Sequence, residues 1–177
     1  MTAANFDKCF KFLLQFEGGF VNDPKDPGGP TNLGVTQATL SGFLGRQATI
    51  AEVKALTPAK VAPLYRANFW DHVNADNLPD GIDLAVFDFG VHSGPTRGVS
   101  ALQRVVGVAD DGKLGDVTTK AANKAGATSA GAKDVINKIC DDRMAFIKKT
   151  KAFKVPKFQK GLINRVEKCR RAALAMA

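Results

Sequence analysis

The segment EGGFVNDPKDPGGPTNLGVT, residues 17–36, separates one helical pattern from the helices that follow and is the most informative stretch for the fold. Four residues in a row, Pro27–Pro30, are glycine or proline. This composition predicts an irregular segment with a short β-hairpin over 20–36 rather than a helix. Gly18 and Gly19 end the preceding helix, since glycine adopts the left-handed conformation of a helix C-terminus without strain.

The helix before this segment brings a carboxyl group to its end. Asn5 can cap the helix, and its apolar residues recur at helical spacing: Phe6, Cys9, Phe10, Leu13 and Leu14. One further step of the stripe reaches Glu17, which we expect at the last inward position of the apolar face. Burial and the negative end of the helix dipole both disfavour the charged form there, which suits a general acid. The alternative is a helix that frays before Gly18, with Glu17 in solvent.

The rest of the chain predicts helices and therefore a mainly α fold. Helical signals cover 37–45, a capping box at Thr49–Glu52, Thr57–Pro58 through Trp70, 80–93, and two long basic helices at 131–151 and 157–175. Gly94–Pro95 stops one of these helices and is the best candidate boundary. We therefore expect two regions, 1–94 and 95–177, the second a helical bundle packed on the first.

Charge is concentrated at the C-terminal end. The chain has 25 basic and 17 acidic residues, a net charge of +8, but 138–171 holds twelve basic and three acidic residues. Three interpretations are open: attraction to an anionic envelope surface, nucleic-acid binding, or a solvated helix face. No recognised nucleic-acid motif accompanies the charge, so we expect no nucleic-acid partner.

Cofactor chemistry and export signals are missing from the sequence. Cys9, Cys140 and Cys169 are odd in number and far apart, which favours a reducing compartment over a disulfide framework. His72 and His92 are the two histidines, and no cluster has metal spacing, so we expect neither metal nor cofactor. The N-terminus lacks a leader pattern, and we expect synthesis in the cytoplasm.

Residues 17–36 resemble the signature of glycoside hydrolase family 108, N-acetylmuramidases of bacteria and bacteriophages. The opening Glu-Gly-Gly-aromatic, the centre Asp-Pro-x-Asp-x-Gly-Gly and the close Thr-x-x-Gly-Val-Thr are all present. YRANFWDHVNADNLPDGIDLAVFDFGVHSG, residues 65–94, is similar to the rest of the catalytic region. ALQRVVGVADDGKLGDVTT and KFQKGLINRV resemble a C-terminal peptidoglycan-binding-type region.

The resemblance implies a lysozyme-like helical fold and a muramidase. Such an enzyme cleaves the β-1,4 bond between N-acetylmuramic acid and N-acetylglucosamine in peptidoglycan glycan strands. It further implies a phage endolysin-like or secretion-associated muramidase that reaches the wall from the periplasm after release through a membrane lesion, and we expect a monomer and, of the two, a phage endolysin. From the residues alone, a non-catalytic wall-binding protein and a basic nucleic-acid binder remain the alternatives.

The same resemblance assigns the catalytic residues. Phage-type lysozymes carry Glu-x8-Asp-x5-Thr, and this chain has Glu17-x8-Asp26-x4-Thr31, one residue shorter before the threonine. By that resemblance Glu17 is the general acid, Asp26 activates or orients water, and Thr31 positions it. The chain departs from the family at His92, where Asn is frequent, and at Leu162, where Gly-Trp is common.

Aromatic and hydroxyl side chains are the candidates for substrate binding. We expect contact with glycan from Phe20, Thr36, Tyr65 and Trp70. Tyr65 and Trp70 also lie at helical spacing with apolar residues, so packing is the competing interpretation for both. Asp88 interrupts an apolar run, and we expect a buried structural carboxylate that binds loop amides rather than a catalytic one.

Overall fold

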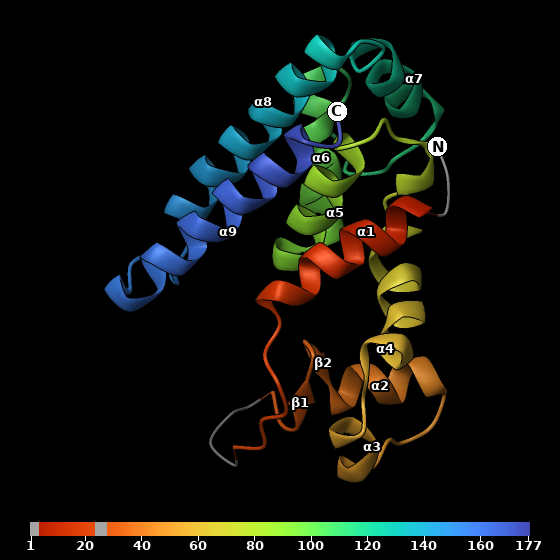
Figure 1. Cartoon of the computed structure of the whole chain (residues 1–177), viewed down its shortest axis with the longest axis vertical. Helices are drawn as coiled ribbons and strands as arrows, with labels where there is room; N and C mark the ends of the chain where they lie inside the picture. Colours follow the sequence, from red (N-terminus) through yellow and green to blue (C-terminus); the bar gives the residue numbers. More distant parts are fainter. Residues whose placement is uncertain (1–3, 24–27) are drawn as a thin grey trace. The chain divides into compact units, whose positions relative to one another are not determined.

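The computed structural model describes residues 4–23 and 28–177, and helices dominate it (Figure 1). The expected mainly α, lysozyme-like fold is confirmed. The described residues form two compact units. We call Phe10–Asn68 the hairpin unit, and the residues up to Cys9 together with Phe69–Ala177 the helical unit.

The hairpin unit is named after its small antiparallel sheet. Strands β1 (Thr31–Asn32) and β2 (Val35–Thr36) pair Thr31 with Thr36 and Asn32 with Val35. An isolated bridge adds Val21 beside Thr31, with backbone hydrogen bonds of 2.8 and 2.9 Å. The hairpin expected within 20–36 is therefore confirmed.

The first helix ends earlier than its apolar stripe predicts. The helix α1 runs over Ala4–Leu13, and the chain then tightens into the 3-10 turn η1, Leu14–Phe16. Glu17 is extended (φ −91°, ψ 135°), and its backbone N–H donates to the Leu14 carbonyl at 3.3 Å. The helical register that predicted an inward Glu17 is wrong beyond Leu13, because a 3-10 turn has three residues per turn instead of 3.6.

Threonine caps set the starts of the next three helices, as the sequence predicts. They are α2 (Gln37–Leu44), α3 (Ile50–Lys54) and α4 (Pro58–Tyr65). Thr36, Thr49 and Thr57 each accept a hydrogen bond from the backbone N–H three residues on, which satisfies a donor that the first turn would leave open. Glu52 completes the capping box of α3. The helix α4 continues as a π-helical turn η2, Arg66–Trp70.

The helical unit is built around α5 (Ile82–Ser93). Every residue from Ile82 to Gly90 is buried, which a helix apolar on all sides requires. It packs against α6 (Pro95–Val106), α8 (Ser129–Lys148) and α9 (Pro156–Leu174) (Figure 1). The remaining elements are η3 (Ala75–Asn77) and α7 (Asp116–Ala125).

Gly94 separates α5 from α6, as expected, and adopts φ 102°. It lies within the helical unit, and the boundary between regions 1–94 and 95–177 stays a prediction. Among residues 4–23 and 28–177, no helix has the length and apolar character required to cross a bilayer.

Candidate active site around Glu17

Glu17 lies where η1 meets the extended segment that leads to the β-hairpin. Its side chain is half-buried. The next residue fixes its position, because the Leu33 backbone N–H donates to the Gly18 carbonyl at 3.0 Å. The turn of the β-hairpin and the glutamate are thus held together within one unit.

Gly34 provides the space in which the Glu17 carboxylate lies. A Cβ at position 34 would come closer than 3.0 Å to Glu17 Oε2, and equally close to the hydroxyl oxygen of Tyr65. The Glu17 carboxylate and the Tyr65 phenol therefore both lie against Gly34 Cα. Gly34 also has φ 72°, a conformation that side chains disfavour. Sequence reasoning missed Gly34, although the Thr-x-x-Gly-Val-Thr motif contains it.

Leu33 is the second unpredicted residue, and it acts through its backbone. With φ 49° it occupies the left-handed region, as the first central position of a type I′ hairpin turn requires. This position normally favours Asn or Gly. The strain is compensated on both sides, since the Leu33 N–H binds Gly18 and its carbonyl accepts the Tyr65 hydroxyl at 3.0 Å.

Thr31 begins the strand beside this turn. Its hydroxyl donates to the Gly29 carbonyl at 3.0 Å, and its backbone pairs with Val21. The hydroxyl oxygen keeps a lone pair that can accept a hydrogen bond from water. Asp26, the expected partner in water activation, lies outside the described residues.

Asn32 anchors the hairpin and was also not predicted. It is buried, and its amide donates to the carbonyls of Val53 and Lys54 at 3.0 and 3.1 Å. These carbonyls lie at the C-terminal end of α3, where helix carbonyls have no intrahelical partner. The bond fixes the hairpin to the helices of its own unit.

Two of the expected substrate-binding residues have other partners in the hairpin unit. The Thr36 hydroxyl caps α2 and lies 2.9 Å from the Thr39 hydroxyl. Phe20 is half-buried with the Lys54 ammonium 5.9 Å from its ring centre. Contact of either with glycan stays a prediction.

Tyr65 and Trp70 differ in what their polar ends do. Tyr65 is 2% exposed, packs on Phe10 and turns its hydroxyl to the β-hairpin. Trp70 is fully buried, with its indole N–H donating to Asp76 at 2.9 Å and its ring packed edge-on against Phe6 and Phe87. The structure thus places Trp70 in the core of the helical unit, and the packing interpretation describes its position.

Asp88 is buried, as expected, but its partners differ from the loop amides we predicted. Arg143 of α8 binds it at 2.5 Å, and Arg165 of α9 binds it at 2.8 Å. Burial alone would raise the pKa of Asp88, but the charges and hydrogen bonds of the two arginines lower it below its ordinary value. These two ion pairs join α5 to α8 and α9, and sequence alone cannot pair residues so far apart.

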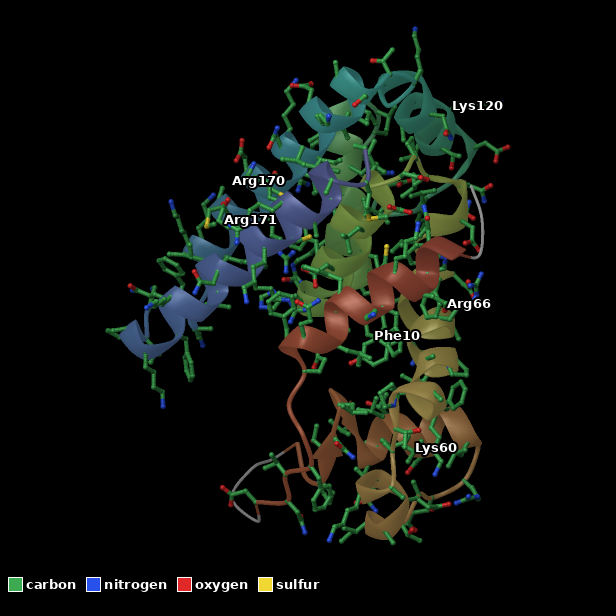
Figure 2. The ribbon with its side chains drawn as sticks, in the orientation of Figure 1. Phe10, Lys60, Arg66, Lys120, Arg170 and Arg171 are labelled. Atoms are coloured by element: carbon green, nitrogen blue, oxygen red, sulfur yellow. The ribbon has the colours of Figure 1, made fainter. Side chains whose placement is uncertain are left out.

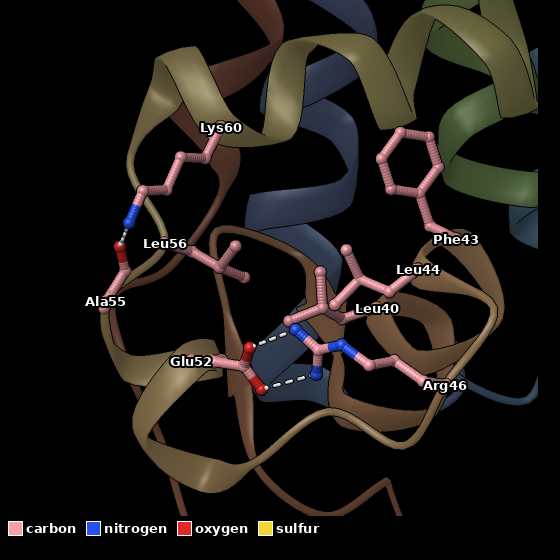
Figure 3. A pocket seen from close by; sticks show the side chains of 8 residues that line it. All are labelled: Leu40, Phe43, Leu44, Arg46, Glu52, Ala55, Leu56 and Lys60. Atoms are coloured by element: carbon pink, nitrogen blue, oxygen red, sulfur yellow. Dashed lines mark hydrogen bonds and ion pairs between the residues drawn. The ribbon is translucent and has the colours of Figure 1, made fainter.

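A pocket elsewhere in the hairpin unit holds none of the expected site residues (Figure 3). Its volume is about 280 Å³, and both apolar and charged side chains line it. Arg46 and Glu52 form a two-bond ion pair at 2.6 and 3.1 Å. The lining residues are Leu40, Phe43, Leu44, Arg46, Glu52, Ala55, Leu56 and Lys60. In the described part of the chain, no group of three or more His, Cys, Asp or Glu side chains could hold a metal.

A half-buried carboxyl group beside a glycine turn and a phenol is a group that can deliver a proton to an oxygen held next to it. This geometry and the mainly α, lysozyme-like fold are compatible with a glycoside hydrolase.

Comparisons with known proteins agree with that class. The family model described as Glycosyl hydrolase 108 matches residues 10–94. The solved structure titled "Structure of Brucella abortus SagA" is 45% identical, with 99% of this chain and 97% of that chain covered, at a TM-score of 0.83. No curated protein sequence matches the chain. The chain belongs to glycosyl hydrolase family 108 and is a glycoside hydrolase that acts on peptidoglycan.

Proposed function

We propose that the chain is an N-acetylmuramidase, which cleaves the β-1,4 bond between N-acetylmuramic acid and N-acetylglucosamine, with Glu17 as the general acid. The observation that carries the proposal is the position of the Glu17 carboxylate opposite Gly34. Because glycine has no side chain, the carboxylate can lie directly against the turn of the β-hairpin, next to the Tyr65 hydroxyl.

Glycosidic hydrolysis needs a proton on the leaving oxygen and attack at the anomeric carbon. Glu17 gives its proton to the leaving oxygen. Water attacks the anomeric carbon from the opposite face, oriented by the Asp26 carboxylate and the Thr31 hydroxyl. The bond to the leaving oxygen breaks, and the Asp26 carboxylate takes up the proton that the water loses. The Thr31 hydroxyl donates to Gly29, so it accepts rather than donates toward the water. The proposed pathway inverts the anomeric configuration, as in phage-type lysozymes.

The test is digestion of purified peptidoglycan, with the released fragments identified by mass spectrometry. We expect fragments with a reducing end at N-acetylmuramic acid from the wild type. Glu17→Gln should release at least 100-fold less, because general acid catalysis contributes about 10²–10⁴-fold. Glu167→Gln, a glutamate of α9 outside the hairpin unit, is the matched control and should keep the wild-type rate.

Three results would contradict this proposal. Release of free peptides without reducing sugar ends would exclude a muramidase. Near wild-type digestion by a folded Glu17→Gln variant would exclude Glu17 as the acid. Wall binding without digestion by the wild type would favour the non-catalytic wall-binding protein.

We also propose that the enzyme works as a monomeric phage endolysin, made in the cytoplasm and acting on the wall from the periplasm after release. The three buried free thiols support synthesis in a reducing compartment. The basic C-terminal helices would then attract the enzyme to an anionic envelope surface, with no nucleic-acid partner. Lysis of Gram-negative envelopes should fall with added salt, since charges are screened over about 8 Å at physiological ionic strength. Digestion rates of envelopes that do not change with salt would contradict the attraction.

A further inference from the structure

The positive charge of the basic helices is unevenly neutralised. In the body of these helices Arg143 and Arg165 bind Asp88, and Lys138 binds Asp134 at 2.7 Å. Arg170, labelled on α9 in Figure 2, binds Asp141 of α8 at 2.7 Å. These carboxylates neutralise most of the basic charge near the core. The positive charge that has no such partner lies in the segment that joins the two helices.

That segment is KKTKAFKVPKFQK, residues 148–160, which we call the α8–α9 tip. It joins α8 to α9 and holds six lysines and no acidic residue (Figure 1). The nearest acidic residues in the sequence are Asp142 and Glu167. Among the described residues no carboxylate forms an ion pair with a lysine of the tip. The tip therefore carries a local charge of +6.

The tip also has no core beneath it. The buried residues of the two helices nearest to it are Ile147 and Val166, and no residue of 148–160 is buried. Its fold is nevertheless defined, because the Thr150 hydroxyl caps the Ile147 carbonyl and Gln159 donates to the Phe153 carbonyl at 2.9 Å. The tip presents its side chains from a turn held by hydrogen bonds.

Apolar side chains lie among these lysines. Phe158 is 48% exposed and Val155 38% exposed. The Lys157 ammonium lies 4.9 Å from the Phe158 ring centre, so a cation and an apolar ring are presented together. Phe158 and Val155 thus add exposed apolar area to a surface that is otherwise cationic.

We propose that the α8–α9 tip docks on an anionic phospholipid bilayer, with Phe158 and Val155 in the headgroup region and the lysines on lipid phosphates. A dissolved or wall-bound polyanion would require only the lysines. A bilayer interface binds both the apolar side chains and the lysines, because the apolar side chains enter the acyl boundary while the lysines remain at the phosphates. A second copy of the tip is a poor partner, since two +6 surfaces repel each other.

This proposal narrows the anionic envelope surface proposed for the basic helices to a phospholipid bilayer, and it rests on the same charge. The assay is binding to vesicles and involves no hydrolysis. If the protein binds vesicles but does not digest peptidoglycan, only the proposed muramidase activity is contradicted. If it digests peptidoglycan but does not bind vesicles, only the proposed docking on a bilayer is contradicted.

The experiment measures sedimentation of the full chain with vesicles of phosphatidylglycerol and phosphatidylcholine, against pure phosphatidylcholine. We expect at least tenfold stronger partitioning to the anionic vesicles. Phe158→Ala should weaken it about fivefold, by loss of buried apolar area. Phe43→Ala is the matched control, because Phe43 is 44% exposed in the hairpin unit and should change nothing.

The lysines are tested by the double variant Lys154→Gln and Lys157→Gln, with Lys120→Gln and Lys124→Gln of α7 as the matched pair. Two juxtamembrane charges are worth about 1 kcal/mol each, so we expect roughly 30-fold weaker binding for the tip pair and little change for the α7 pair. None of these four side chains is buried, and thermal unfolding should confirm that each variant folds.

Three results would overturn the proposal. Equal partitioning of Phe158→Ala and Phe43→Ala would leave only an electrostatic surface. Binding to a soluble polyanion such as polyphosphate, with no preference for anionic vesicles, would assign the tip to a polymer. A concentration-dependent dimer that Phe158→Ala abolishes would assign the tip to a second copy of the chain.

Discussion

The Glu17 carboxylate lies in a space that exists because Gly34 has no side chain. A Cβ at position 34 would overlap Glu17 Oε2 and the Tyr65 hydroxyl. The glycine that closes the β-hairpin is therefore also a wall of the candidate active site. Glycine at position 34 therefore meets two requirements, a backbone with positive φ and room for the carboxyl group against the turn.

Gly34→Ala should abolish most of the activity. The new methyl group displaces the carboxylate and the phenol, and we expect digestion of purified peptidoglycan to fall at least tenfold. Gly45→Ala is the matched control, because Gly45 has φ 66° in the same unit but no atom within 4 Å of the place a Cβ would take. Both variants should lose about 1–2 kcal/mol of unfolding free energy from the left-handed backbone. Equal activities of the two would show that the space beside Glu17 is not needed.

Tyr65→Phe should reduce activity more than its stability loss explains. The variant keeps the ring packed on Phe10 but leaves the Leu33 carbonyl without its 3.0 Å hydrogen bond. We expect a loss of about 1 kcal/mol in unfolding free energy and about tenfold in digestion rate. Thr49→Ala removes the cap of α3 at a similar cost of about 1 kcal/mol and should remain fully active. A fully active Tyr65→Phe would limit the hydroxyl to a structural role.

Asp88→Asn should destabilise the fold severely. Without the carboxylate, Arg143 and the largely buried Arg165 keep uncompensated charge, which costs about 3–5 kcal/mol. Denaturant unfolding measures this loss. Asp134→Asn breaks the exposed pair with Lys138 and should cost less than about 1 kcal/mol. Similar losses for both variants would mean that the buried ion pairs contribute no more than a surface pair.

His92 should make the fold sensitive to acid. Burial, and then the positive charges of Arg143 and Arg165, lower the pKa of His92 from 6.5 to about 4. The folded state thus keeps a neutral ring where the unfolded state takes up a proton. Its contribution is complete above pH 6.5 and is lost as the pH falls toward 4.

Unfolding free energies of wild type and His92→Asn, measured from about pH 7.5 to about pH 4, test this effect. We expect their difference to change by about 2 kcal/mol, in favour of the variant at low pH, after allowance for the partial exposure of the ring. Subtraction of the two curves removes Asp83, whose burial raises its pKa to about 6 and whose effect on stability has the opposite sign. Parallel curves would show that the His92 pKa is ordinary.

Local signals in the sequence were sufficient for much of the fold. Thr36, Thr49 and Thr57 capped the helices where their spacing predicted, because a cap depends only on residues within one turn. The β-hairpin followed from the glycines and prolines of 17–36. The end of α1 was harder to predict, since nothing in the apolar stripe distinguishes an α-helical from a 3-10 last turn.

The candidate acid, Glu17, could be predicted from the sequence, but the residues around it could not. Glu17 stood out as a carboxyl group at the end of an apolar stripe. Leu33 did not, because its contribution is a strained backbone whose N–H and carbonyl bind Gly18 and Tyr65. Trp70 could be a sugar platform or a core residue at the same spacing, and only packing against Phe6 and Phe87 placed it in the core.

The mainly α class, the hairpin segment and the candidate acid could be predicted from local sequence, because each depends on neighbours within a few residues. The partners across long separations are visible only in the folded chain: Gly34 and Tyr65 beside Glu17, and Arg143 and Arg165 around Asp88. The structure also shows that no residue of the α8–α9 tip is buried, whereas Arg143 and Arg165 of the same helices pair with the buried Asp88. Burial and charge pairing are properties of packed elements, and a periodic pattern along one chain does not contain them.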